Sequence, residues 1–132
     1  MIVDFHTHIF PEKIAAKTIQ KLEEKAGVKA FTDGREASLL NSMKKAGVDI
    51  SVILPVVTSP AQFDTVNRFA AAVNEKYEGK STRLVSFGGI HPDSSDYKNK
   101  LREIKSLGLK GIKLHPDYQD TFFDDIRYLR IL

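Results

Sequence analysis

The histidine pair in His6-Thr7-His8 is the part of this sequence best suited to chemistry. In an extended strand alternate residues share one face, so both imidazoles are expected on the same side as Asp4. Neutral imidazole is a common ligand for zinc and similar divalent ions. We therefore predict that His6 and His8 bind one metal ion. Asp4 is interpreted either as the acceptor of a hydrogen bond from the ring N–H of a ligating histidine or as a buried, hydrogen-bonded acid without a metal role.

A lysine and the two remaining histidines follow other apolar runs. Alternation within residues 110–116 places Lys113 and His115 on the face opposite the apolar side chains. A buried lysine cation needs an acid, a substrate anion or a metal-bridging carboxylate formed by carbamylation. Lys113 and His115 are therefore candidates for catalysis or substrate binding; the alternatives are a lysine that reaches solvent and a histidine that only forms hydrogen bonds. His91 is either a further candidate or a turn histidine that stabilises its loop.

Strands and helices alternate along the chain and would position these residues. Apolar runs predict strands at 2–8, 50–57, 83–90 and 110–114. Helical spacing predicts helices at 12–25, 36–46 and 60–78. A fourth helix contains Tyr97, Leu101 and Ile104 and ends at Gly108, and a last one begins within 124–132. This order predicts a parallel sheet, either open and doubly wound or part of a (β/α)8 barrel. All four histidines then lie at or near the C-terminal ends of strands, where such barrels build their active sites.

Composition restricts the classes of function. A chain of 132 residues with 42% hydrophobic and 28% charged residues is typical of one globular domain. The net charge is only +3 and no basic cluster is present, so no nucleic-acid partner is expected. Neither a signal peptide nor an apolar stretch of about 20 residues is found, so no membrane association is expected. The lack of cysteine excludes a thiolate metal site and fits a cytoplasmic location.

Three motifs together resemble the amidohydrolase superfamily: Asp4–Pro11, Gly89–Pro92 and Gly108–Pro116. The similarity is greatest to the amidohydrolase-related branch that includes aminocarboxymuconate-semialdehyde decarboxylase. The resemblance implies a (β/α)8 TIM barrel, present here as roughly its first four β/α units. It also implies a divalent metal, usually zinc, on His6 and His8. The implied activity is a hydrolase or decarboxylase acting on a small organic acid or amide, with the metal activating water or polarising the substrate.

The same resemblance implies that part of the site is missing. Family members also use a histidine from the fifth strand, often one from the sixth, and an aspartate from the eighth. A complete barrel needs about 250 residues, so residues 1–132 are expected to form a single domain, the N-terminal half, ending inside the helix after the fourth strand. Asp124 and Asp125 are interpreted as first-turn helix residues, not as the missing aspartate. Exposed sheet edges, including residues 111–114, predict either self-association or poor behaviour in solution.

Two other functions remain open at this point. A phosphoesterase of the polymerase-and-histidinol-phosphatase type also opens with a His-x-His strand followed by proline, but it needs further acidic and histidine ligands. The other alternative is a non-catalytic, metal-free remnant or assembly module. A small-molecule substrate is expected for either enzyme.

Overall fold

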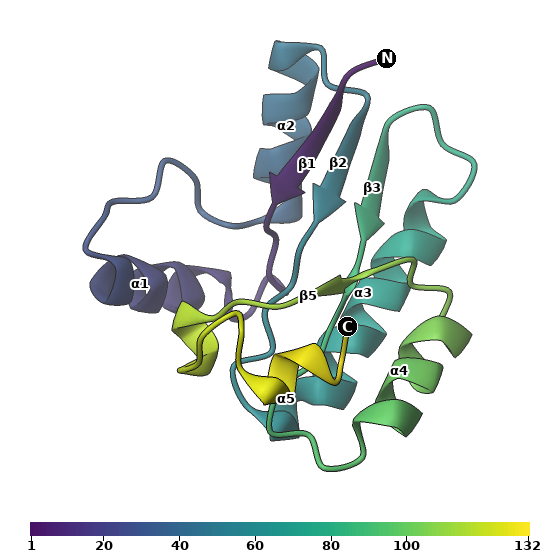
Figure 1. The fold of residues 1–132 in the computed structure, drawn as a ribbon. Coiled ribbons are helices and arrows are strands. Elements are labelled where there is room, and N and C mark those ends of the chain that lie inside the picture. The colour runs from purple at the N-terminus through teal and green to yellow at the C-terminus, as the bar shows by residue number, and fades with distance from the viewer.

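The computed structural model describes residues 1–132 and shows short parallel strands covered by helices (Figure 1). The strands are β1 (Val3–Thr7), β2 (Ile50–Ile53), β3 (Arg83–Ser86), β4 (Gly88–Gly89) and β5 (Ile112–Lys113). The helices are α1 (Ala15–Ala26), α2 (Glu36–Ala46), α3 (Phe63–Tyr77), α4 (Tyr97–Ser106) and α5 (Ile126–Leu129). Short 3-10 helices, η1 (Pro60–Gln62) and η2 (Asp117–Gln119), precede α3 and follow β5.

The strands form two separate sheets. One has the order β1-β2-β3 and the other pairs β4 with β5, all in parallel. Figure 1 shows β5 crossing the direction of β1, β2 and β3 instead of extending their sheet. The prediction of the first four β/α units of a (β/α)8 TIM barrel is therefore wrong, because such units would share one continuous sheet. The chain is a small α/β domain with little strand.

The sheets separate because the predicted strand 83–90 changes partner at Phe87. The Phe87 N–H donates to the carbonyl of Ile53 in β2 at 3.0 Å, whereas the Gly88 N–H donates to the carbonyl of Gly111 at 2.8 Å. The Phe87 ring lies so close to Gly111 that a Cβ added there would be 2.6 Å from the ring. Glycine at 111 therefore permits the close approach of the second sheet to Phe87. Apolar patterning in the sequence does not specify this exchange of partners.

Two asparagines of α3 hold the chain on either side of this exchange. The Asn74 amide donates to the Ser86 carbonyl at 3.0 Å, and its Oδ1 accepts from the Ser86 N–H at 2.6 Å. Asn67, which is fully buried, donates to the Gly89 carbonyl and accepts from the Gly89 N–H, both at 2.9 Å. These amides bond to backbone groups of β3 and β4 as a neighbouring strand would, so a side-chain clamp fixes the end of each sheet.

Replacing Asn74 with alanine should lower the free energy of unfolding by about 1.5 kcal/mol, because both Ser86 backbone groups lose a partner in a half-buried position. Urea denaturation would measure the change. Asn41→Ala is a matched control, since Asn41 is exposed on α2 and should tolerate the substitution within about 0.5 kcal/mol. Equal stability of the two variants would contradict the clamp.

Helix α3 joins the two halves of the core. One apolar cluster lies between the first sheet, α2 and α3; its buried members are Ile9, Met43, Ile53, Val73, Tyr77 and Leu84. The second lies among α3, α4 and the chain's last residues; its buried members are Phe63, Ala70, Ile90, Ile104, Leu109 and Ile131. Because α3 contributes to both clusters, burial of its apolar face stabilises both sheets. No helix combines the length and apolar character needed to cross a membrane.

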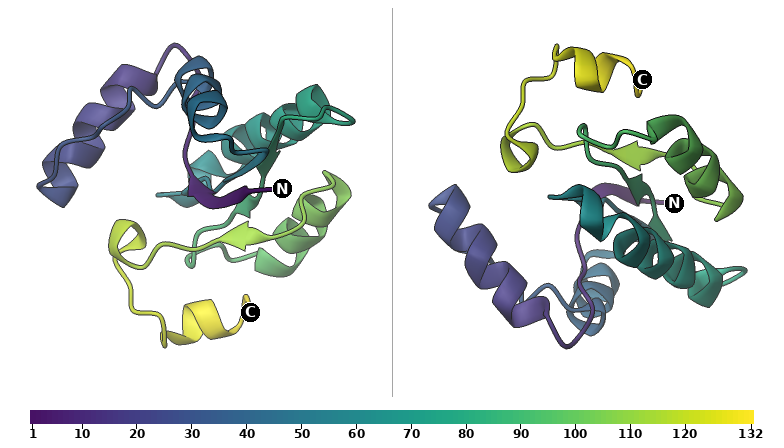
Figure 2. Two further views of the ribbon diagram at one scale, coloured as in Figure 1. Left: turned by 90° about the horizontal axis from the view of Figure 1, so that it is seen from above. Right: turned by 90° about the horizontal axis from the view of Figure 1, so that it is seen from below.

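The first strand and first helix are the least covered elements. β1 is an edge strand, and Ile2, Val3 and Phe5 are 55%, 41% and 61% exposed. Figure 2 shows α1 projecting on one side of the strands, with α5 and the C-terminus on the other. The far end of α1 is tied back by Lys25, whose ammonium donates to the carbonyl of Asp117 at 3.0 Å. This hydrogen bond connects α1 to the segment that follows β5.

Candidate metal and substrate site

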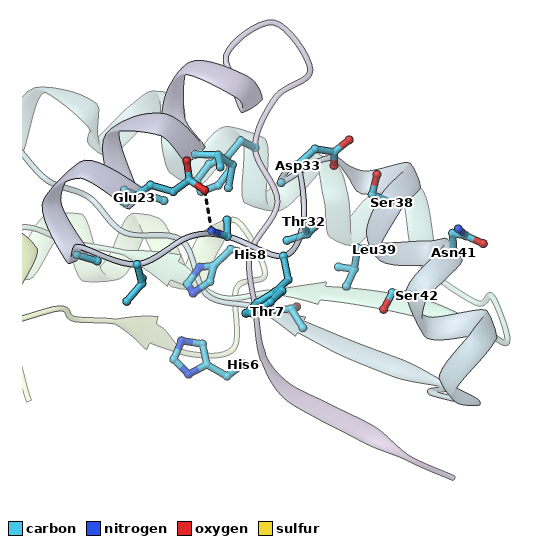
Figure 3. A pocket seen from close by; sticks show the side chains of 18 of the residues that line it. His6, Thr7, His8, Glu23, Thr32, Asp33, Ser38, Leu39, Asn41 and Ser42 are labelled. Atoms are coloured by element: carbon cyan, nitrogen blue, oxygen red, sulfur yellow. Dashed lines mark hydrogen bonds between the residues drawn. The ribbon is translucent and has the colours of Figure 1, made fainter.

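The two histidines of the first motif lie side by side at the end of β1. Their ring centroids are 5.1 Å apart, and Figure 3 shows both rings on the same side of the chain. Thr7, buried between them, fixes this position, because its hydroxyl donates to the Val52 carbonyl at 2.8 Å and its own carbonyl accepts from the Leu54 N–H at 3.0 Å. The backbone between the histidines is therefore anchored to β2 while their rings remain accessible.

The surroundings of His8 keep its imidazole neutral. Burial of the ring lowers its pKa, and the neighbouring His6, Lys113 and His115 act in the same direction, although a hydrogen bond with the backbone of Leu54 opposes them. A neutral imidazole is the form that coordinates a metal ion. The cluster therefore favours the ligating form of His8 near neutral pH.

Lys113 and His115 belong to the same cluster. Burial and the charge of Lys113 lower the pKa of His115, Asp117 opposes them, and His6 also contributes to the lowering. Lys113 is half-buried at the end of β5 and forms no ion pair with any carboxylate. An ammonium group in this position is most stable beside an anion. The charges of Lys113 and His115 thus act on His8, and Lys113 has no acidic partner.

Two residues that the sequence patterns did not reveal hold His115 in place. The ring of Tyr118 stacks on the His115 ring at a centroid distance of 4.3 Å, and its backbone N–H donates to His115 Nδ1 at 3.4 Å. Buried Gln119 accepts from the His115 N–H at 3.0 Å and donates to the carbonyls of Val57 and Ile90 at 2.7 and 2.9 Å. Gln119 therefore joins the loops that follow β2, β4 and β5. A polar residue in a short loop carries no periodic signal that would predict this role.

The other two candidates lie differently. The Asp4 carboxylate accepts from the backbone N–H of His6 at 3.2 Å, and no hydrogen bond joins it to a histidine ring. His91 is buried in the loop after β4, where its Nδ1 accepts from the Asp93 N–H at 3.2 Å. The charged groups that act on His91 are Asp93, Arg127 and Asp120, not the histidines of β1. This geometry favours the loop-stabilising interpretation of His91.

The position of Asp125 confirms its predicted place at a helix start. Its side chain accepts from the Arg127 N–H at the beginning of α5. Hydrogen bonds from Arg127 hold the pKa of this carboxyl well below its usual range. The carboxylate is therefore committed to a structural ion pair.

Lowering the pH should destabilise the fold partly through His91. Burial lowers the pKa of His91 in the folded state. In the unfolded state the pKa of this histidine is about 6.5, so below that pH the unfolded state binds more protons than the folded state. Stability is then lost between about pH 6.5 and the lowered folded pKa. In His91→Gln the free energy of unfolding should fall less steeply with decreasing pH, by at most about 1.4 kcal/mol per pH unit. Urea denaturation between pH 5 and 7.5 would test this, and parallel slopes would contradict it.

The available donors fit a metal ion only in part. His6 and His8 present two imidazoles, but no group of three or more histidine, cysteine, aspartate or glutamate side chains lies close enough to hold an ion. Zinc takes four ligands in most structural sites and three protein ligands with an open position in catalytic sites. The pair therefore supplies two of the ligands that a zinc ion requires.

Two cavities adjoin the histidine pair. The larger, about 960 Å³, lies between α1 and α2 and reaches both His6 and His8. Polar side chains of the 32–42 region, including Thr32, Asp33 and Ser38, line its far side (Figure 3). The smaller cavity, about 390 Å³, reaches only His8 of the pair. Volumes in this range accommodate small organic ligands.

Comparison of the chain with protein-family models, curated proteins and solved structures gives no match. The amidohydrolase resemblance therefore rests on the three sequence motifs alone.

Proposed function

We propose that this chain carries part of the site of a metal-dependent hydrolase or decarboxylase that acts on a small organic acid or amide. The observation that carries the proposal is one cluster: the adjacent rings of His6 and His8, with Lys113 and His115 close enough to lower the pKa of His8. Neutral imidazoles suit a divalent ion, and a lysine without a carboxylate partner suits a substrate anion.

Each residue has a definite task in this proposal. His6 and His8 would hold the ion, with zinc the expected metal, and Thr7 keeps their backbone fixed through β2. When bound, zinc would polarise a substrate carbonyl and lower the pKa of a water molecule. Lys113 would bind and orient the substrate carboxylate or amide oxygen. His115 has Nδ1 occupied by the Tyr118 N–H, which leaves Nε2 to exchange a proton or hydrogen bond with substrate.

The phosphoesterase alternative is less well supported. A multi-metal site needs several acidic and histidine ligands close together, and the structure contains no such group of three. The metal-free alternative makes the opposite prediction for zinc binding, so a single measurement separates it from the proposal.

The test is zinc binding followed by an activity screen. In equilibrium dialysis against zinc, the purified protein should retain up to about one weakly held ion per chain, because the pair supplies only two ligands. The loaded protein would then be screened for carbon dioxide release from small carboxylic acids and for hydrolysis of their amides, with Lys113→Met as the variant that lacks the anion-binding group. Retention of zinc with activity that depends on Lys113 supports the proposal. Failure of the wild type to retain zinc would favour the metal-free alternative.

Two further expectations belong to this proposal. We expect a cytoplasmic location, which fractionation of cells would test. We also expect self-association through the uncovered sheet edges, because the outer edge of β1 is unpaired and carries exposed apolar side chains. Sedimentation as a monomer at all concentrations would contradict the second expectation.

A further inference from the structure

The smaller cavity beside His8 differs in chemistry from the larger one. Eleven of its eighteen lining residues are hydrophobic. The lining comes from the loop after β1, from α1, from the end of β2 and the loop after it, from η1 and the start of α3, and from Tyr118. Ile14, Pro55, Val56, Val66 and Phe69 are among them. An apolar cavity of about 390 Å³ would hold a phenyl ring or a branched aliphatic group, since burial of such a group away from water is favourable.

His8 stands where the two cavities meet. It lines both, together with Phe10, Leu22 and Tyr118, whereas His6 lines only the larger. Tyr118 in turn stacks on His115. A molecule whose reacting group lies against His6 and His8 therefore has the polar side chains of the larger cavity on one side and the apolar cavity on the other.

Tyr118 is held firmly enough to act as a wall between these regions. One contact is the stack on the His115 ring at 4.3 Å, and the other is the ammonium of Lys25, which lies 4.9 Å from the Tyr118 ring centroid. Lys25 also donates to the carbonyl of Asp117, the residue before Tyr118. The ring thus connects α1 to the substrate-binding residues of β5.

We propose that the cavity beside His8 is an apolar subsite, walled by Tyr118, which makes the preferred substrate a carboxylic acid or amide with a compact hydrophobic substituent. This inference rests on the proposed function for the reacting group. It commits to a small amphipathic molecule because the neighbouring cation, Lys113, lacks an acidic partner while the cavity lining is largely apolar. Tyr118 is then a specificity-determining residue.

The experiment compares three probes by NMR titration of the full chain: phenylacetate, acetate and benzyl alcohol. Zinc-loaded wild type should bind phenylacetate about tenfold or more tightly than acetate, because only phenylacetate fills the cavity. Val66→Trp, which fills the cavity from α3, should abolish this preference while zinc content stays unchanged. Ala72→Trp is the matched control, since it adds the same bulk at an exposed position of α3 outside the cavity, and it should keep the preference.

A second variant and the neutral probe keep the test decisive. Tyr118→Ala should weaken phenylacetate binding more than acetate binding, whereas Tyr118→Phe should retain the wild-type ratio. Benzyl alcohol should bind metal-free wild type and be excluded by Val66→Trp, so the subsite is tested even where zinc binding, and with it the proposed function, fails. Equal affinity of wild type for acetate and phenylacetate, or undiminished benzyl alcohol binding in Val66→Trp, would overturn the subsite.

Discussion

Replacement of Gln119 with leucine should lower the free energy of unfolding by about 4 kcal/mol, the largest stability loss expected from any one side chain of the site. The substitution leaves the carbonyls of Val57 and Ile90 without a donor, and the His115 N–H and the Tyr128 hydroxyl without an acceptor. Each buried polar group left without a partner costs roughly 1–3 kcal/mol. Urea denaturation monitored by circular dichroism would measure the loss.

Two controls separate the hydrogen-bond network from packing. Gln119→Glu keeps the side-chain shape and an acceptor but removes the amide donor to Val57 and Ile90, so it should also be strongly destabilising at neutral pH. Gln20→Leu changes an exposed glutamine of α1 that bonds only to Glu24, and its effect should stay within about 0.5 kcal/mol. If Gln119→Leu were as stable as Gln20→Leu, the loops after β2, β4 and β5 would not depend on this residue.

Replacement of His8 with alanine should reduce zinc affinity at least about 100-fold, so that the variant shows no measurable zinc binding. Loss of a residue that only orients a ligand already costs about 10–100-fold in metal affinity, and loss of a ligand itself should cost more. The pair is sensitive because it supplies only two imidazoles and no third histidine or acidic group lies close enough to compensate. Isothermal titration calorimetry with zinc would give the affinity.

His91→Gln is the matched control for this prediction. It also removes an imidazole, but from the loop after β4, where the ring bonds to Asp93 and lies outside the histidine pair. Zinc affinity should therefore be unchanged in His91→Gln and reduced similarly in His6→Ala and His8→Ala. Stoichiometric zinc in His8→Ala would rule out the ligand assignment.

Local patterns in the sequence predicted the helices better than the sheet. The apolar spacing and the following glycine placed the helix 36–46 at the bounds that α2 has in the structure. The apolar stripe of α3 was recognised in the sequence, but Asn67 and Asn74 on the same helix were overlooked. Asn67 is buried and Asn74 is half-buried. A polar residue on such a stripe is a readable signal, because its burial requires hydrogen-bond partners.

The sheet was predicted less well because strand pairing is a long-range property. The run 83–90 has one continuous pattern, and only contacts with Ile53 on one side and Gly111 on the other decide that it divides at Phe87. Hydrogen-bond partners tens of residues away leave no mark on local periodicity. For this reason the barrel prediction failed while the helices and the parallel α/β character were found.

For the candidate site, the sequence by itself determined which side chains could do chemistry: two histidines one residue apart, and a lysine and a histidine after a later apolar run. Local alternation is enough for that, because it depends only on strand geometry. Only the tertiary structure decided that the charges of Lys113 and His115 act on His8, that His91 and Asp4 bond elsewhere, and that Tyr118 and Gln119 hold His115. Those outcomes depend on packing between segments distant in the chain, where burial and hydrogen-bond satisfaction select one arrangement.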